Sequence, residues 1–153
     1  MKIASPAFAD SQNIPAKFTC DGENVSPPLQ IADSPAGTKS LALVMDDPDI
    51  PDFVKQKFGI AVFDHWIAFN IPPTTQQIAA GQQIGTCGKN SSGKAEYAGP
   101  CPPDREHRYF FKIYALDTLL DLPEGADKAG LENAMASHIL GQARLIGLYS
   151  RSK

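Results

Sequence analysis

The chain has 153 residues, enough for one domain with a buried core, and we expect a single domain over residues 1–153. Its 17 acidic and 14 basic residues give a formal charge of −3, and the basic residues are scattered, so the charge gives no reason to expect a nucleic-acid partner. No segment approaches the roughly 20 apolar residues of a membrane-spanning helix, and the N-terminus lacks the apolar core of a signal peptide, so we expect a cytoplasmic protein without an integral membrane segment.

Short apolar runs separated by 13 prolines and 12 glycines predict an all-β fold, because both residues mark turns and are poorly tolerated inside long helices. In chain order, we expect strands at residues 17–20, 40–46, 66–71, 108–115 and 145–150, with a further strand beginning within 27–31. Every residue from 41 to 45 is apolar, which is typical of a strand covered on both faces.

The segment 107–115 alternates in character. His107, Tyr109 and Phe111 share one face, because successive side chains of a strand point to opposite sides. His107 and Tyr109 are therefore expected to point the same way, roughly 6–7 Å apart along the strand, so that one ligand could contact both.

One helix is expected over residues 127–138, where apolar residues recur with helical spacing. Asp127 suits its N-cap, and Gly141 stands where the chain would leave the helix. The segment 53–64 is ambiguous between a loop and a short helical turn.

The three cysteines are Cys20, Cys87 and Cys101. An odd number in a chain without a signal peptide favours free thiols over a disulfide framework. A pair between Cys87 and Cys101 stays open.

Polar side chains stand at three of the expected strand ends. Asp47 lies in an acidic turn after the run 41–45, His65 precedes the strand 66–71, and His107 and Tyr109 open the next long run. If these ends share one rim of a sheet protein, a carboxylate, two imidazoles and a phenol converge. A lone histidine is usually a packing residue, but this combination favours a small ligand pocket.

Other chemistries fit the sequence less well. The turn 46–52 carries four carboxylates, but prolines interrupt the spacing of a calcium-binding EF-hand loop. Residues 88–94 match Gly-x4-Gly-Lys, yet Ala95 stands where a nucleotide-binding P-loop needs Ser or Thr. Cys87 and Cys101 are too far apart for a structural zinc pair, and no Gly-x-Ser-x-Gly elbow is present. We therefore expect no metal and no cofactor, and nothing in the sequence supports a Ser or Cys nucleophile beside His107.

The arrangement of motifs resembles the phosphatidylethanolamine-binding protein family, which includes the Raf kinase inhibitor protein, and especially its bacterial and archaeal branch. The resemblance spans nearly the whole chain, and the motifs are specific in this order and spacing rather than singly. They are Phe18-Thr-Cys-Asp-Gly-Glu-Asn-Val-Ser-Pro-Pro-Leu29, Asp47-Pro-Asp-Ile-Pro51, His65-Trp66 with Asn70-Ile-Pro72, Tyr97-Ala-Gly-Pro-Cys-Pro-Pro103 with His107-Arg-Tyr109, and the closing segment 134–149.

This resemblance implies a sandwich of two antiparallel β-sheets with one or two short helices and a small anion pocket at one edge. The family pocket takes phosphate, phosphorylethanolamine or similar anions, so the expected partner is a small phosphate-type anion or a phospholipid head group. A homodimer is also expected, by analogy with bacterial relatives. The matching positions are Asp47, His65, Gly99, Pro100, His107 and Tyr109 as ligand-binding residues, with Pro48, Asp49 and Cys101 in support.

We expect a non-enzymatic binding or regulatory protein. Both imidazoles would donate charge-assisted hydrogen bonds to the anion, with Tyr109 and backbone N–H groups around Gly99 as further donors. Asp47 would orient one histidine, while Asp64 departs from the family pattern by adding a carboxylate beside His65.

The alternative function is an inhibitor of a partner protease or kinase, which an exposed apolar patch around residues 53–63 would favour. A phosphoester hydrolase comes third. It would use Asp47, His65 and His107 as acid, base and orienting residue.

Overall fold

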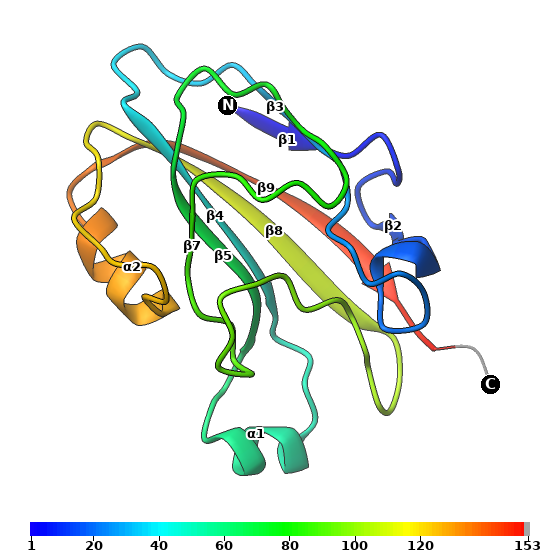
Figure 1. Ribbon diagram of the computed structural model, residues 1–153. Helices are drawn as coiled ribbons and strands as arrows, with labels where there is room; N and C mark the ends of the chain where they lie inside the picture. The colour runs from blue at the N-terminus through cyan, green and yellow to red at the C-terminus, as the bar shows by residue number, and fades with distance from the viewer. Residues whose placement is uncertain (152–153) are drawn as a thin grey trace.

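Two β-sheets face each other in the computed structural model, which describes residues 1–151 (Figure 1). Two α-helices and a 3₁₀-helix accompany them, and the strand pairs are antiparallel except for the parallel pair formed by residues 12–13 and 147–148. The expected sandwich with few helices is confirmed. The strands are β1 Lys2–Ala4, β2 Gln12–Asn13, β3 Leu29–Ala32, β4 Ser40–Asp47, β5 Phe63–Ile71, β6 Gln77–Ile78, β7 Thr86–Cys87, β8 His107–Leu116 and β9 Ile139–Tyr149; the helices are η1 Ala16–Phe18, α1 Asp52–Phe58 and α2 Lys128–Met135.

The larger sheet has the strand order β2-β9-β8-β4-β5-β7, and the smaller one β1-β3-β6. Apolar side chains from both sheets, such as Ile31 of β3 and Phe111 of β8, form the main core between them. A second cluster lies on the opposite face of the large sheet, where Leu131 and Met135 of α2 pack. Every residue of β4 is buried, because the two clusters cover its two faces, as its unbroken apolar run predicts.

Strand β8 confirms the expected alternation. His107, Tyr109 and Phe111 are buried toward the small sheet, while Arg108 and Phe110 on the other face are more exposed. The pocket residues of β8 therefore continue the face that forms the main core.

The one predicted helix is present as α2, although it is shorter than expected. In α2, Asp127 is the N-cap and its side chain accepts a hydrogen bond of 2.9 Å from the Gly130 amide. The helix ends at Met135, and Gly141 belongs to β9, which begins six residues earlier than expected. The first part of the ambiguous segment 53–64 is helical: α1 ends at Phe58, and its C-cap Gly59 has the left-handed conformation that glycine adopts readily.

The strand expected at residues 17–20 is wrong. This segment continues from the 3₁₀-helix η1, and the Thr19 amide bonds to the carbonyl of Ala16 at 3.1 Å. The backbone is thus satisfied locally, without a partner strand.

The expectation of free thiols is also wrong for two of the three cysteines. Cys20 and Cys101 form a disulfide across 81 residues, whereas Cys87 is free and buried, so the alternative Cys87–Cys101 pair is not formed. Disulfides are characteristic of oxidising compartments. The cysteines therefore give no support to a cytoplasmic location, which stays a prediction. Among residues 1–151, no helix is long and apolar enough to cross a membrane.

Candidate functional site

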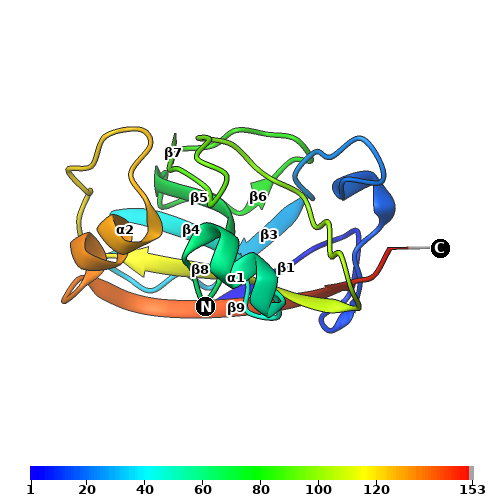
Figure 2. The same cartoon turned by 90° about the horizontal axis from the view of Figure 1, so that it is seen from below.

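The end of β4 and the beginnings of β5 and β8 meet at one rim of the large sheet, beside α1. Helix α1 lies below these strand ends in Figure 1 and in the foreground of Figure 2. A cavity of about 320 Å³ opens here. Its lining includes Asp47, Ile50, Phe53, Val54, Lys57, Phe58, Phe63, His65, Ser92, Ala98, Gly99, Cys101, Pro102, Pro103, His107 and Tyr109. The four chain-distant residues singled out in the sequence thus surround one cavity.

Asp47 and His107 form a buried pair at this rim. The Oδ2 atom of Asp47 lies 2.7 Å from Nδ1 of His107, and the two side chains are 3% and 1% exposed. The other carboxylate oxygen accepts a hydrogen bond of 2.7 Å from the Asp49 amide. Burial raises the pKa of Asp47, and the hydrogen bonds from His107 and Asp49 oppose that shift. The carboxylate thus fixes the orientation of the imidazole ring.

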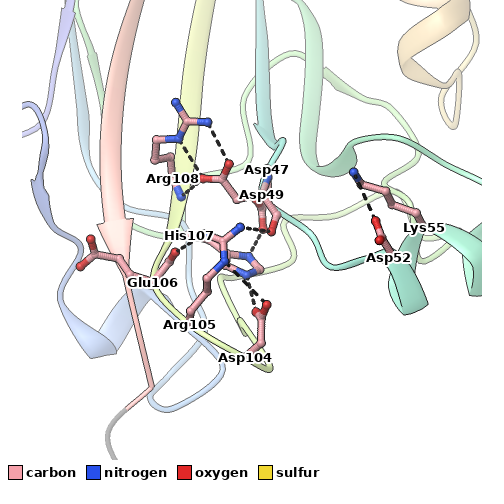
Figure 3. Close-up of polar contacts among 9 residues, drawn as sticks. All are labelled: Asp47, Asp49, Asp52, Lys55, Asp104, Arg105, Glu106, His107 and Arg108. Atoms are coloured by element: carbon pink, nitrogen blue, oxygen red, sulfur yellow. Dashed lines mark hydrogen bonds and ion pairs between the residues drawn. The ribbon is translucent and has the colours of Figure 1, made fainter.

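A second carboxylate holds the opposite side of the same ring. Oδ1 of Asp104 lies 2.6 Å from Nε2 of His107 (Figure 3). Partial burial acts to raise the pKa of Asp104, but the hydrogen bonds from His107 and nearby backbone outweigh it and leave this pKa below its usual range. Sequence reasoning missed Asp104, because its position three residues before His107 does not reveal which way an exposed turn directs a side chain.

His65 reaches the cavity through an irregularity in the sheet. Met45 pairs with Trp66, but the next residue, Asp46, pairs with Asp64, so His65 is an extra residue in β5. Such a β-bulge redirects a side chain that strict alternation would send to the other face. The His65 ring lies 5.2 Å from the ring of Tyr109, measured between centroids.

The protonation of His65 differs from the expectation. Its Nδ1 lies 2.7 Å from the carbonyl oxygen of Ala98, which can only accept, so Nδ1 carries a proton. Burial lowers the pKa of His65 to about 4. The ring is therefore neutral near pH 7, and its Nε2 is an acceptor. The prediction of two cationic imidazole donors is wrong for this histidine.

Tyr109 is fully buried between the two histidines. Its ring centroid lies 6.3 Å from that of His107 and 5.2 Å from that of His65. Its hydroxyl has no hydrogen-bond partner within residues 1–151. Burial raises the pKa of Tyr109 well above its ordinary value, so the hydroxyl keeps its proton. A buried donor without an acceptor is costly and calls for an explanation.

Ala98, Gly99 and Cys101 form another wall. The amide of Gly99 donates to Oδ1 of Asn24 at 2.9 Å, so this amide is not the free anion donor that we expected. A Cβ atom at position 99 would overlap the Asn24 side chain and approach the carbonyl oxygen of Phe18 to 2.8 Å, which explains why glycine stands there. Pro100, expected as a ligand-binding residue, is buried and does not line the cavity; its carbonyl accepts from the Cys20 amide at 3.1 Å. The disulfide at Cys101 ties this wall to the same N-terminal segment.

Pro48 and Asp49 support the turn after β4 and do not line the cavity. Both oxygens of Asp49 bond to the Arg108 guanidinium at 2.8 Å (Figure 3). These bonds lower the pKa of Asp49 to about 2. The ion pair anchors the turn that carries Asp47 to the first residues of β8.

The mouth of the cavity is apolar on the side of α1. Phe53 and Phe58 are 61% and 41% exposed, and Lys57 lies beside them with its Nζ 5.4 Å from the Phe58 ring. The sequence did not predict this wall, because an isolated seven-residue helix has little intrinsic stability and weak periodicity.

The extra carboxylate expected beside His65 is not there. Asp64 lies on the other face of the sheet, 2.7 Å from Nζ of Lys128, because the bulge separates it from His65. No group of three His, Cys, Asp or Glu residues suited to a metal ion occurs within the described part of the chain.

Fold and rim together define a β-sandwich protein with a cavity at one rim, where a carboxylate, two imidazoles and a tyrosine meet among apolar side chains. A family model for phosphatidylethanolamine-binding protein matches residues 4–150. The chain belongs to the phosphatidylethanolamine-binding protein family, and the resemblance drawn from the sequence is confirmed.

Relatives occur in archaea and bacteria. The chain is 48% identical over 158 residues to a UPF0098 protein of Methanothermobacter thermautotrophicus, covering 99% of each chain. It is 44% identical to a UPF0098 protein of Chlamydia pneumoniae, covering 99% of this chain and all of that one.

Two solved structures show the same fold. A phosphatidylethanolamine-binding protein homologue from Chlamydia trachomatis has a TM-score of 0.94 at 41% identity, covering 99% of this chain and 97% of that one. The protein YbcL of E. coli, described as a member of the mammalian family, has a TM-score of 0.86 at 26% identity, covering 99% and 98%.

Proposed function

We propose that this chain is a binding or regulatory protein whose rim cavity takes a small phosphate-type anion, as free phosphate, a phosphorylated metabolite or a phospholipid head group. The observation that carries the proposal is the buried hydroxyl of Tyr109, which has no partner within residues 1–151, on a ring whose centroid lies 5.2 Å from that of the neutral His65 ring. A donor that lacks an acceptor inside a cavity is an expected feature of a site completed by a ligand.

The two rings suit a protonated oxyanion. The Tyr109 hydroxyl donates to one phosphate oxygen, while Nε2 of His65 accepts from a P–OH group. A phosphate monoester carries that proton below its second pKa of about 6. Lys57 adds a positive charge at the mouth of the cavity. The arrangement thus favours the monoanion over the dianion.

The test is calorimetric titration of phosphorylethanolamine into wild type, Tyr109→Phe and His107→Ala. Loss of one hydrogen bond to a charged group, about 1.5–3 kcal/mol, weakens affinity at least tenfold for Tyr109→Phe. The unliganded variant keeps or gains stability, because an unpaired buried hydroxyl is removed. Tyr114→Phe, on the opposite face of β8, is the matched control and binds like wild type. Wild-type affinity in Tyr109→Phe would refute the pocket assignment, whereas wild-type affinity in His107→Ala would show that the anion does not bond to this ring.

A second candidate function has its own support. Phe53 and Phe58 expose apolar surface on α1, which is the feature that favours an inhibitor acting on a partner protease or kinase. The double variant Phe53→Ser/Phe58→Ser should lose inhibition of a sensitive enzyme in a protease and kinase panel. Retained inhibition, or no inhibition by wild type, would remove this candidate.

A further inference from the structure

Both ring nitrogens of His107 already have partners within the protein. Its Nδ1 faces Asp47 at 2.7 Å and its Nε2 faces Asp104 at 2.6 Å, so each ring nitrogen already has a carboxylate partner (Figure 3). An incoming anion finds no free N–H on this ring. It can bond to His107 only by replacing one of the two carboxylates.

The two carboxylates are not equally replaceable. Asp47 is 3% exposed, belongs to β4 and also holds the Asp49 amide. The Asp104 side chain is 33% exposed and stands on the exposed turn 103–106. Apart from His107, its partners belong to the same turn: the Arg105 side chain, whose Nε lies 3.9 Å away, and backbone amides of residues 104 and 105. Asp104 is therefore the carboxylate that an external anion can displace.

The turn that carries Asp104 lies between two fixed points. Cys101 anchors its N-terminal side through the disulfide, and β8 begins at His107 on its C-terminal side. Only residues 102–106 lie between these two anchors. A displacement of Asp104 thus needs a rearrangement of this short segment, in which residues 103–106 are exposed and Arg105 donates a hydrogen bond of 3.4 Å to the Asp49 carbonyl.

We propose that Asp104 is a tethered competitor that occupies the place of the ligand's anionic group on His107 Nε2, and that the turn 102–106 opens when the anion binds. This inference rests on the proposed function and specifies its regulation. The closed state lowers the apparent affinity in proportion to its population, because only the open state offers the Nε2 donor. The site therefore discriminates against anions that bind His107 less well than a carboxylate does.

The decisive comparison uses two variants with the same change of charge. Asp104→Asn removes the charged competitor from His107. Glu106→Gln removes one negative charge from the same turn, but the Glu106 side chain makes no hydrogen bond or ion pair with any residue in 1–151. With inorganic phosphate as the probe, Asp104→Asn should bind about tenfold more tightly than wild type, and Glu106→Gln less than about twofold. Asp104→Ser, which cannot reach Nε2, provides the same test if the asparagine variant folds poorly.

Side-chain ¹⁵N NMR of the histidines adds a direct readout. Without phosphate, Asp104→Asn should move the Nε2 resonance of His107, whereas Glu106→Gln should leave it in place. Equal gains in affinity for both variants, or no gain for Asp104→Asn and Asp104→Ser, would overturn the inference while leaving the pocket assignment intact. Absence of phosphate binding in wild type and all variants would overturn the proposed function, and this inference with it.

Discussion

The carboxylate of Asp47 lies 2.7 Å from Nδ1 of His107, although the two residues are 60 positions apart in the chain. The contact joins the last residue of β4 to the first residue of β8, strands that are neighbours in the large sheet. It is therefore both a structural link across the rim and the element that sets the orientation of the imidazole.

Removing this carboxylate should destabilise the protein and weaken anion binding. Asp47→Ala leaves Nδ1 of His107 buried without a partner, which costs about 1–3 kcal/mol of unfolding free energy. Asp47→Asn should cost less, since the amide oxygen can still accept the hydrogen bond. Urea unfolding at pH 7 measures the free energy of unfolding of both variants. The control is Asp52→Asn, which removes a carboxylate that is 93% exposed on α1 (Figure 3). An Asp47→Ala variant as stable as this control would show that the pair does not support the fold.

Much of the fold could be predicted because strand periodicity leaves a mark on the sequence. The run from Leu41 to Met45 is apolar at every position, and β4 is indeed covered on both faces. The alternation in β8 correctly places His107 and Tyr109 on one side. Once β4, β5 and β8 are neighbours in one sheet, the polar residues at their ends must gather at the same rim.

The features that the sequence did not predict depend on the three-dimensional positions of single residues. The bulge at His65 is a one-residue change of register between β4 and β5, and no residue type in the sequence predicts it. The disulfide depends on Cys20 and Cys101 approaching to a Cα separation of 5.4 Å, which spacing along the chain does not encode. The neutral state of His65 follows from its burial, which only the packed structure reveals.

The stability of the protein should fall on acidification because of His65. Its pKa is about 4 in the folded state and near 6.5 when unfolded, so between these values the unfolded chain binds the extra proton. Stability from this residue is complete above pH 6.5 and declines toward pH 4, by about 3 kcal/mol in all. Urea unfolding of wild type and His65→Gln from pH 4.5 to 7.5 tests this.

Comparing the pH dependence of stability between wild type and His65→Gln separates the effect of His65 from that of other titrating groups. His65→Gln should show a flatter dependence on pH, while His138→Gln, which removes a side chain 43% exposed, should keep the wild-type slope because His65 remains. Parallel curves for wild type and His65→Gln would contradict the buried, neutral state of this ring.

Anion affinity should weaken as the pH rises above about 6. The proposed complex needs one proton between Nε2 of His65 and the phosphate, and the dianion that prevails at higher pH must acquire it. Affinity should then fall up to tenfold per pH unit, with proton uptake detectable by calorimetry in buffers of different ionisation enthalpy. The sulfate ester of ethanolamine, which carries no such proton near neutrality, should bind more weakly than phosphorylethanolamine at pH 6. Affinity that is flat or rises with pH would exclude this arrangement.

The disulfide should contribute strongly to stability and to the shape of the cavity. It closes a loop of 81 residues, and the entropy of such a loop corresponds to about 4–5 kcal/mol, with measured losses for native disulfides of about 2–5 kcal/mol. Cys20→Ser/Cys101→Ser should therefore unfold at much lower urea concentration than wild type. It should also bind phosphate more weakly, because Cys101 anchors the wall that carries Gly99. Cys87→Ala, which alters the buried free thiol, is the control. Its urea midpoint should still fall when a thiol reductant is added, because the disulfide is unchanged. If a thiol reductant leaves the urea midpoint of wild type unchanged, the cross-link does not hold the N-terminal segment to this wall.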